Sequence, residues 1–105
     1  MGDVKLILND KGHGGFYISD GSEQLGEMEI SIVGNRLTAF HTEVSPKAEG
    51  KGFAKMLLNA MVDHARKNDL KVIPLCPYVH LQFKRHPEEF ADVWFKEERS
   101  DEQNR

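Results

Sequence analysis

A glycine-rich segment with the sequence EGKGFA, residues 49–54, directly precedes a stretch with helical periodicity. In such a loop the backbone N–H groups can converge on one point, where the dipole of the following helix adds partial positive charge. Gly50 and Gly52 have no side chain that would block a close approach, and Lys51 and Lys55 carry positive charge. The segment therefore indicates a phosphate or pyrophosphate site. A loop whose glycines serve only a tight turn explains it equally well, because neither a P-loop nor a complete dinucleotide fingerprint is present.

Cys76 is the single cysteine of the chain and lies between Pro74 and Pro77. If the apolar run that it closes is a strand, its thiol lies at the carboxyl edge of a sheet and is available for catalysis. The alternative is a small buried hydrophobic side chain, which is the usual role of a free cysteine. With one cysteine, the chain can form no intrachain disulfide and no cysteine-rich zinc site.

His41 and Glu43 stand two residues apart in the segment FHTEV. Strand alternation places them on one face together with Ala39. The opposite face then carries Phe40, Thr42 and Val44. A histidine and a carboxylate in this arrangement can act as a general base with an orienting group. A solvated face with a hydrogen-bonded histidine is the other interpretation.

The remaining histidines give no catalytic or metal-binding pattern. His64 falls inside the apolar arc of a predicted helix and is interpreted as a histidine at the edge of the core. The spacing of His13, His80 and His86 does not resemble that of metal ligands, so no metal site is expected.

Composition restricts the class of protein. The chain has 105 residues, of which 39% are hydrophobic and 30% charged, and these values fit one globular domain. Its formal net charge of -3 argues against nucleic acid as the main partner. No apolar run reaches the roughly 18 residues of a membrane span, and the first residues lack the form of a signal peptide. We therefore expect a soluble cytoplasmic protein with no membrane partner.

The first 44 residues are predicted to form an antiparallel meander. Apolar or alternating runs predict strands at 4–8, 16–18, 27–33 and 36–44. Glycine and asparagine at 33–36 predict a tight hairpin between the last two of these strands.

The second half of the chain predicts alternating helices and strands. Residues 53–67 form the clearest helix, with Phe53, Ala54, Leu57, Leu58, Ala60, Met61 and Ala65 on one arc. The continuous apolar run 70–76 predicts a strand buried on both faces. A short helix at 78–85, a turn at 86–90 and a last strand at 91–95 follow. We expect one domain over residues 1–95 and a polar tail over 96–105.

The predicted order gives an α/β (α+β) fold. An antiparallel N-terminal meander is followed by a right-handed β-α-β crossover, which makes the sheet mixed. The glycine-rich segment then lies between the carboxyl end of a strand and the N-terminus of the main helix. Sheets of this class tend to bind ligands at that position.

Three separated segments carry a resemblance to a known family. HTEVSPKAEGKGFAKMLL is followed after one helix by LKVIPLCPYV and then by RHPE. Together they resemble the GNAT acetyltransferase superfamily, and within it the small single-domain subfamily of about one hundred residues. The resemblance covers roughly residues 13–95. It implies a mixed sheet whose splayed parallel strands hold acetyl-CoA.

The resemblance also implies roles for the glycine-rich segment. The Q/R-x-x-G-x-G/A loop of the superfamily binds the pyrophosphate of acetyl-CoA through backbone N–H groups, and it falls on Glu49, Gly52 and Ala54. Glu49 departs from the usual Gln or Arg. Because the loop works through its backbone, anion binding is expected to survive this change, with an affinity weakened by the nearby negative charge. The implied cofactor-binding set comprises Val44, Glu49, Gly50, Lys51, Gly52, Phe53, Ala54, Lys55 and Tyr78. The backbone near Glu43 and Val44 would bind the pantetheine arm, and the helix from Tyr78 would flank the cofactor.

The implied reaction is transfer of an acetyl group from acetyl-CoA to an amine. His41 is the candidate base, with Glu43 orienting it. Cys76 would lie near the thioester, where it either supports direct transfer or forms a covalent acetyl intermediate.

The chain lacks the extra N-terminal helices of larger superfamily members, so the acceptor groove is expected to be open. That suits an exposed amine on a protein or peptide, or a dimer that completes the site. The acceptor is thus an amine on a protein, a peptide or a small molecule, and we expect a monomer or a weak homodimer. A non-catalytic module that binds CoA or acyl-CoA is the alternative function. A protein-interaction domain with a purely structural loop is a third.

Overall fold

A computed structural model describes residues 3–96 of the chain. Its single five-stranded sheet has the order β1-β2-β3-β4-β5. The strands are β1 (Val4–Leu8), β2 (His13–Asp20), β3 (Glu23–Val33), β4 (Arg36–Val44) and β5 (Lys71–Pro74). The first four pair in antiparallel fashion and β5 runs parallel to β4. The predicted meander and mixed sheet are therefore confirmed.

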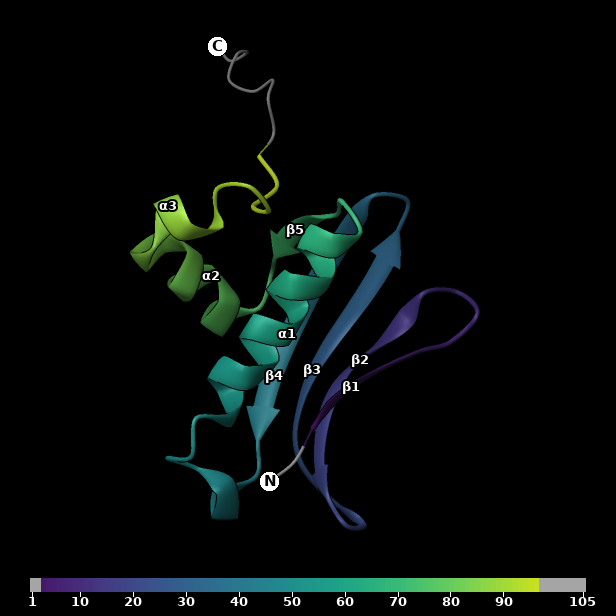
Figure 1. Cartoon of the computed structure of the whole chain (residues 1–105), viewed down its shortest axis with the longest axis vertical. Coiled ribbons are helices and arrows are strands. Elements are labelled where there is room, and N and C mark those ends of the chain that lie inside the picture. The colour runs from purple at the N-terminus through teal and green to yellow at the C-terminus, as the bar shows by residue number, and fades with distance from the viewer. Residues whose placement is uncertain (1–2, 97–105) are drawn as a thin grey trace.

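The helices cover one face and one edge of the sheet. They are the 3-10 helix η1 (Pro46–Ala48), α1 (Phe53–Lys67), α2 (Pro77–Arg85) and the short α3 (Pro87–Phe90). Figure 1 shows α1 lying along the sheet, while α2 and α3 lie beside β5, far from β1. Within residues 3–96, no helix is long and apolar enough to cross a membrane.

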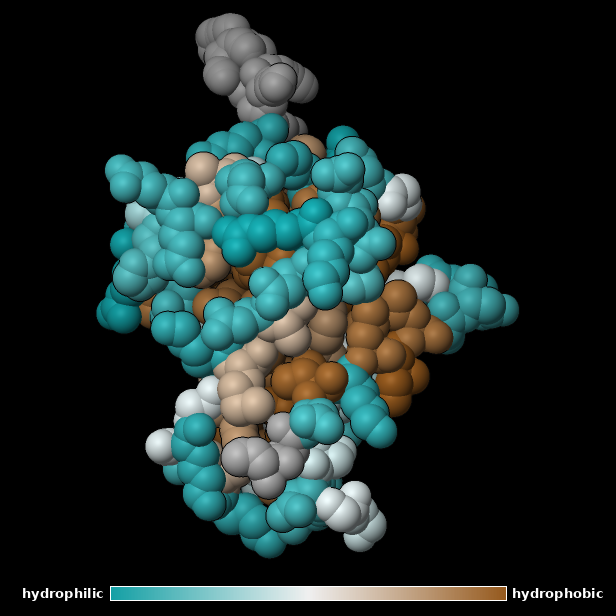
Figure 2. Space-filling model, viewed as in Figure 1, coloured by the Kyte–Doolittle hydropathy of each residue, from teal (hydrophilic) through white to brown (hydrophobic). Residues whose placement is uncertain are grey.

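The packing of α1 follows from its apolar arc. Its bounds agree with the prediction, and its buried residues are Phe53, Leu57, Leu58, Met61, Val62 and Ala65. Val62 was not part of the predicted arc, whereas Ala54 and Ala60 are only half-buried. Figure 2 shows apolar surface beside α1 over β1 and β2, where the partly buried side chains Val4, Leu6 and Leu8 pack against the core.

The pairing of β4 with β5 ends before β4 itself ends. Their pairing runs from Arg36 opposite Lys71 to Ala39 opposite Pro74. One further hydrogen bond, from the N–H of Cys76 to the carbonyl of Ala39, closes the pair at 2.8 Å. Residues 40–44 of β4 then continue with no partner in β5. Because β5 ends where this pairing ends, residues 40–44 have a free edge beside the start of α2. We call this opening the fork; it lies where the splay of the two parallel strands was expected.

The strand predicted at 70–76 is present as β5, but its predicted end and its burial on both faces were wrong. β5 ends at Pro74, and the side chain of Leu75 is 61% exposed. The N–H of Leu75 donates to the carbonyl of Ile73, so the chain turns tightly instead of extending the ladder. Pro74 has no N–H to donate, which also favours the end of the strand there. Cys76 consequently precedes α2 and does not belong to the strand.

The last predicted elements also differ from the structure. Residues 91–93 form a turn, and Trp94 makes only an isolated bridge with Val72, so the strand predicted at 91–95 was wrong. The turn predicted at 86–90 contains the helical turn α3. Backbone hydrogen bonds of Val72 with Val93 and Phe95 hold this segment, and Arg66 also donates to the Asp92 carboxylate at 2.8 Å. Most of the predicted tail, residues 97–105, lies outside the described residues.

A bulge in β4 changes which side chains share a face. Glu29 of β3 pairs with His41, but the next residue of β3, Ile30, pairs with Ala39, so Phe40 is an extra residue. Ala39 is fully buried, whereas the His41 side chain is 46% exposed. The expectation that Ala39 shares the face of His41 was therefore wrong, because the extra residue shifts the alternation by one.

Candidate functional site

The glycine-rich loop lies between η1 and α1 and needs its glycines. Gly50 and Gly52 have φ values of +83° and +79°, in the left-handed region that other residues rarely adopt. A Cβ atom added at either position would meet no atom within 4 Å. The glycines are therefore required by the backbone conformation and leave open space in front of the loop.

The backbone N–H groups of this loop are free. None of residues 50–55 donates its N–H to another described residue; the bond from Met56 to the carbonyl of Gly52, at 3.1 Å, is the first of the helix. No side chain caps α1, and its first turn has no acidic residue. Unsatisfied donors at the positive end of a helix dipole form a site for an anion.

The side chains around the loop differ in their accessibility. Lys51 and Lys55 are exposed, as is Glu49, which follows η1 directly. Phe53 is 8% exposed and belongs to the core, so it anchors the start of α1 and can offer a ligand only its backbone. The site therefore combines backbone donors and two cationic side chains with one carboxylate nearby.

Cys76 lies at the closed end of the fork. Its side chain is 1% exposed, and its sulfur is 3.3 Å from the Oγ1 of Thr42. Tyr78, in the first turn of α2, is half-buried. Burial raises the pKa of the Tyr78 phenol, and the neighbouring Cys76 contributes to the same shift. The fork thus ends in a poorly solvated group of polarisable and hydroxyl-bearing side chains.

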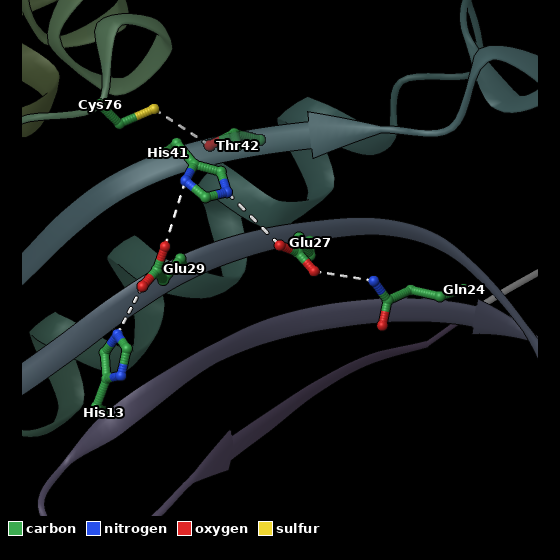
Figure 3. A network of polar contacts seen from close by, with 7 residues as sticks. All are labelled: His13, Gln24, Glu27, Glu29, His41, Thr42 and Cys76. Carbon is green, nitrogen blue, oxygen red and sulfur yellow. Dashed lines mark hydrogen bonds and ion pairs between the residues drawn. The ribbon is translucent and has the colours of Figure 1, made fainter.

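His41 lies on the sheet face opposite α1, between two glutamates. Its Nδ1 is 3.3 Å from the Oε1 of Glu29, and its Nε2 is 3.6 Å from the Oε2 of Glu27. Figure 3 shows the row of side chains that runs from His13 through Glu29 and His41 to Glu27. Glu43 is directly opposite Glu27 in the ladder. His41 is thus held by cross-strand carboxylates of β3, which the sequence interpretation did not include.

A model of the GCN5-related N-acetyl-transferase family matches residues 15–93. The chain belongs to this family. Among curated proteins, none matches the chain significantly.

Solved structures agree with the family assignment. A GCN5-like protein from Staphylococcus aureus, a candidate N-acetyltransferase, is 31% identical to the chain, with a TM-score of 0.68. That match covers 96% of this chain and 95% of the other.

More distant structures share the fold. A ribosomal-protein alanine N-acetyltransferase from Escherichia coli is 16% identical with a TM-score of 0.57, over 63% of this chain and 43% of the other. A ribosomal-protein-alanine N-acetyltransferase from Brucella melitensis is 17% identical with a TM-score of 0.59, over 85% of this chain and 66% of the other.

In this GCN5-related domain the predicted catalytic residues form two groups. Thr42 directs its side chain toward Cys76, as Figure 3 shows, while the adjacent His41 is on the other face of β4. His41 therefore lies in the part of β4 that has no partner in β5, Cys76 lies beside that part on the other face, and the two side chains make no contact. The sequence held a signal for Glu27 and Glu29, since alternation around buried Met28 places both on the outer face.

Proposed function

We propose that this protein is an acetyl-CoA-dependent N-acetyltransferase that transfers the acetyl group to an amine. The observation that carries the proposal is the fork between β4 and β5, which opens toward a loop of free N–H groups. Members of the family use acetyl-CoA as the acetyl donor. The fork offers backbone hydrogen-bond donors to the amides of acetyl-CoA, and the loop offers them to its pyrophosphate.

The loop would hold the pyrophosphate. Residues 50–55 supply N–H donors that have no acceptor among the described residues, and Lys51 and Lys55 supply positive charge. The β4 segment from Phe40 to Val44 has one edge with no partner in β5, so its backbone can bond an extended ligand as a further strand would. Tyr78 would then border the ligand from α2.

His41 would act as the base in the transfer. It would take a proton from the bound ammonium group, and the free amine nitrogen would then form a bond to the acetyl carbon while the C–S bond breaks. As the C–S bond breaks, the nitrogen loses its second proton, which the departing CoA thiolate takes up to leave as the free thiol. The carboxylate of Glu29, 3.3 Å from Nδ1, would orient the ring and stabilise its protonated form. Glu43 on the same face would attract the cationic acceptor.

Cys76 would support the direct route and would not carry the acetyl group. Its side chain is 1% exposed and its sulfur contacts Thr42, so attack on a thioester would require the fork to open. A nucleophilic thiol is normally found in a partly exposed, electropositive environment.

The proposal is tested with acetyl-labelled CoA and a panel of amines: a polyamine, a lysine-containing peptide and a peptide with a free N-terminus. We expect label on at least one acceptor amine and no lasting label on Cys76. Binding of CoA without transfer to any amine would instead support a non-catalytic CoA-binding module. Failure to bind CoA at millimolar concentration would contradict both functions.

A further inference from the structure

We propose that Glu27, His41 and Glu43 form a binding site for a divalent transition-metal ion of the Zn²⁺ type. The site lies on the face of the sheet opposite α1. It is independent of the acetyl-CoA loop, and its test requires no transferase activity.

The three side chains converge on one point. One donor atom from each of Glu27, His41 and Glu43 lies within 4.8 Å of the other two. In a tetrahedral zinc site with bonds of about 2.0–2.1 Å, neighbouring donors are about 3.3 Å apart. The Nε2 of His41 and the Oε2 of Glu27 are already 3.6 Å apart. Small rotations of exposed side chains would complete the geometry.

The ladder places two negative charges directly opposite each other. Glu27 and Glu43 are cross-strand partners, an arrangement that destabilises a sheet when both carboxylates are ionised. Among residues 3–96, neither forms an ion pair with a lysine or arginine. A cation between them would remove the repulsion, and His41 beside them supplies the nitrogen ligand that favours a transition metal over Mg²⁺ or Ca²⁺.

A second row of contacts orients these ligands. The other ring nitrogen of His41, Nδ1, faces the Oε1 of Glu29 at 3.3 Å, and the Oε2 of Glu29 is 2.6 Å from the Nε2 of His13. Metal-binding histidines usually donate their second N–H to a carboxylate in this way. On the other side, Gln24 donates to the Oε1 of Glu27 at 2.9 Å and leaves Oε2 directed at His41.

Three protein ligands leave one position of a tetrahedral ion open to water. An ion bound here would also occupy the Nε2 lone pair, so His41 could not accept a proton at that atom. If His41 is the base of the proposed transfer, Zn²⁺ inhibits the reaction. This consequence rests on the proposed function, whereas binding of the ion does not.

Binding is measured by calorimetry with ZnCl₂ on the full chain, free of any affinity tag and of chelating buffer. We expect one ion per chain. His41→Ala and Glu43→Gln should each weaken binding at least about 100-fold, because each removes a ligand and loss of a residue that only orients a ligand already costs about 10- to 100-fold. His80→Ala, which removes an exposed histidine of α2, is the matched control and should bind as the wild type does. Equal affinity of His41→Ala and the wild type would overturn the proposal.

Two further measurements distinguish a metal site from a purely structural cluster. Glu29→Gln should weaken Zn²⁺ binding about 10- to 100-fold although it removes no direct ligand. Co²⁺ added to the wild type should give the visible absorption of a four-coordinate ion, and Glu43→Gln should lower it. Without metal, Glu43→Gln should unfold at a higher urea concentration than the wild type, because the cross-strand repulsion is gone. A Co²⁺ spectrum identical to that of the free aqueous ion would contradict the proposal.

Discussion

The sulfur of Cys76 and the Oγ1 of Thr42 are 3.3 Å apart, which joins the start of α2 to β4 just beyond the point where β4 and β5 separate. Thr42 lies in the part of β4 that has no partner in β5. The contact therefore supports the closed end of the fork from inside the core. Cys76 therefore contributes mainly to packing and not to the chemistry of the transfer.

Replacement of Cys76 by alanine should therefore affect stability more than activity. The change removes one buried sulfur, which we expect to lower the free energy of unfolding by about 1 kcal/mol. Acetyl transfer should keep most of its rate, because the direct route does not use the thiol. Urea unfolding and labelled-acetyl transfer measure the two effects. Complete loss of transfer in a folded variant, with acetyl found on wild-type Cys76, would support the covalent route instead.

Gly50→Ala should weaken the binding of CoA. The new Cβ would enter the open space in front of the free N–H groups, and the positive φ of 83° would be strained by about 1 kcal/mol. A hydrogen bond to a charged group contributes about 1.5–3 kcal/mol. If the new methyl group removes about half of one such bond, the dissociation constant for CoA, measured by calorimetry, should rise about 10-fold.

Gly34→Ala is the matched control for this loop. Gly34 has a φ of +60°, its added Cβ would also meet no atom within 4 Å, and it lies in the hairpin between β3 and β4. It should lose similar stability and bind CoA unchanged. Equal effects of Gly50→Ala and Gly34→Ala on CoA affinity would show that the loop acts only as a turn.

His41→Ala should slow the transfer step. Loss of a general base typically costs about 10²- to 10⁴-fold in rate, so kcat should fall by at least 100-fold. The dissociation constant for CoA should not change, since His41 contacts Glu27 and Glu29 and not the loop. Steady-state kinetics and calorimetry measure the two quantities, with His80→Ala as the control. An unchanged kcat would remove His41 from the mechanism.

The ion pair between Arg66 and Asp92 should make stability depend on pH in the acid range. The Arg66 guanidinium, hydrogen-bonded to Asp92, holds the pKa of that carboxyl below its ordinary value. The ionised pair therefore stabilises the fold above the unfolded pKa of about 3.9 and loses this effect as pH falls through the folded pKa. Because both side chains are largely exposed, we expect about 0.5 kcal/mol.

Urea unfolding of the wild type and Asp92→Asn at pH 7 and pH 3 measures this difference. The wild type should be more stable at pH 7, and the gap should shrink at pH 3. Glu88→Gln, at an exposed position of α3, should show no such gap. A gap of the same size at both pH values would mean that the pair contributes through packing and not through charge.

Sequence patterns predicted correctly those elements that pack one face against a single neighbouring surface, such as the sheet under α1. The bounds of α1 followed from its apolar arc, from Gly52 before it and from the polar residues after Lys67. The end of β5 did not, because LKVIPLC is apolar throughout while only the tertiary structure leaves Leu75 exposed. The isolated bridge at Trp94 could not be predicted from the sequence either, because it depends on where the chain returns to the sheet after α3.

The candidate site was predicted only in part, because some of its residues are contiguous in sequence and others come together only in the fold. The glycine-rich loop is contiguous in sequence, so its residue types alone indicated an anion site. The environment of His41 depends on the register of β3 against β4 and on the bulge at Phe40. An extra residue leaves no mark on the pattern FHTEV, and the partners Glu27 and Glu29 come from another strand. Spacing within β4 therefore pointed to Glu43 alone.

The acetyl-CoA site is tested most directly by an NMR titration of ¹⁵N-labelled protein with CoA. We predict that the backbone amide signals of residues 50–55 and of β4 beyond Ala39 shift as CoA is added. The amides of β1 (Val4–Leu8), at the far edge of the sheet, should not shift. Shifts confined to β1 and β2, or no shifts at millimolar CoA, would contradict the acetyl-CoA site.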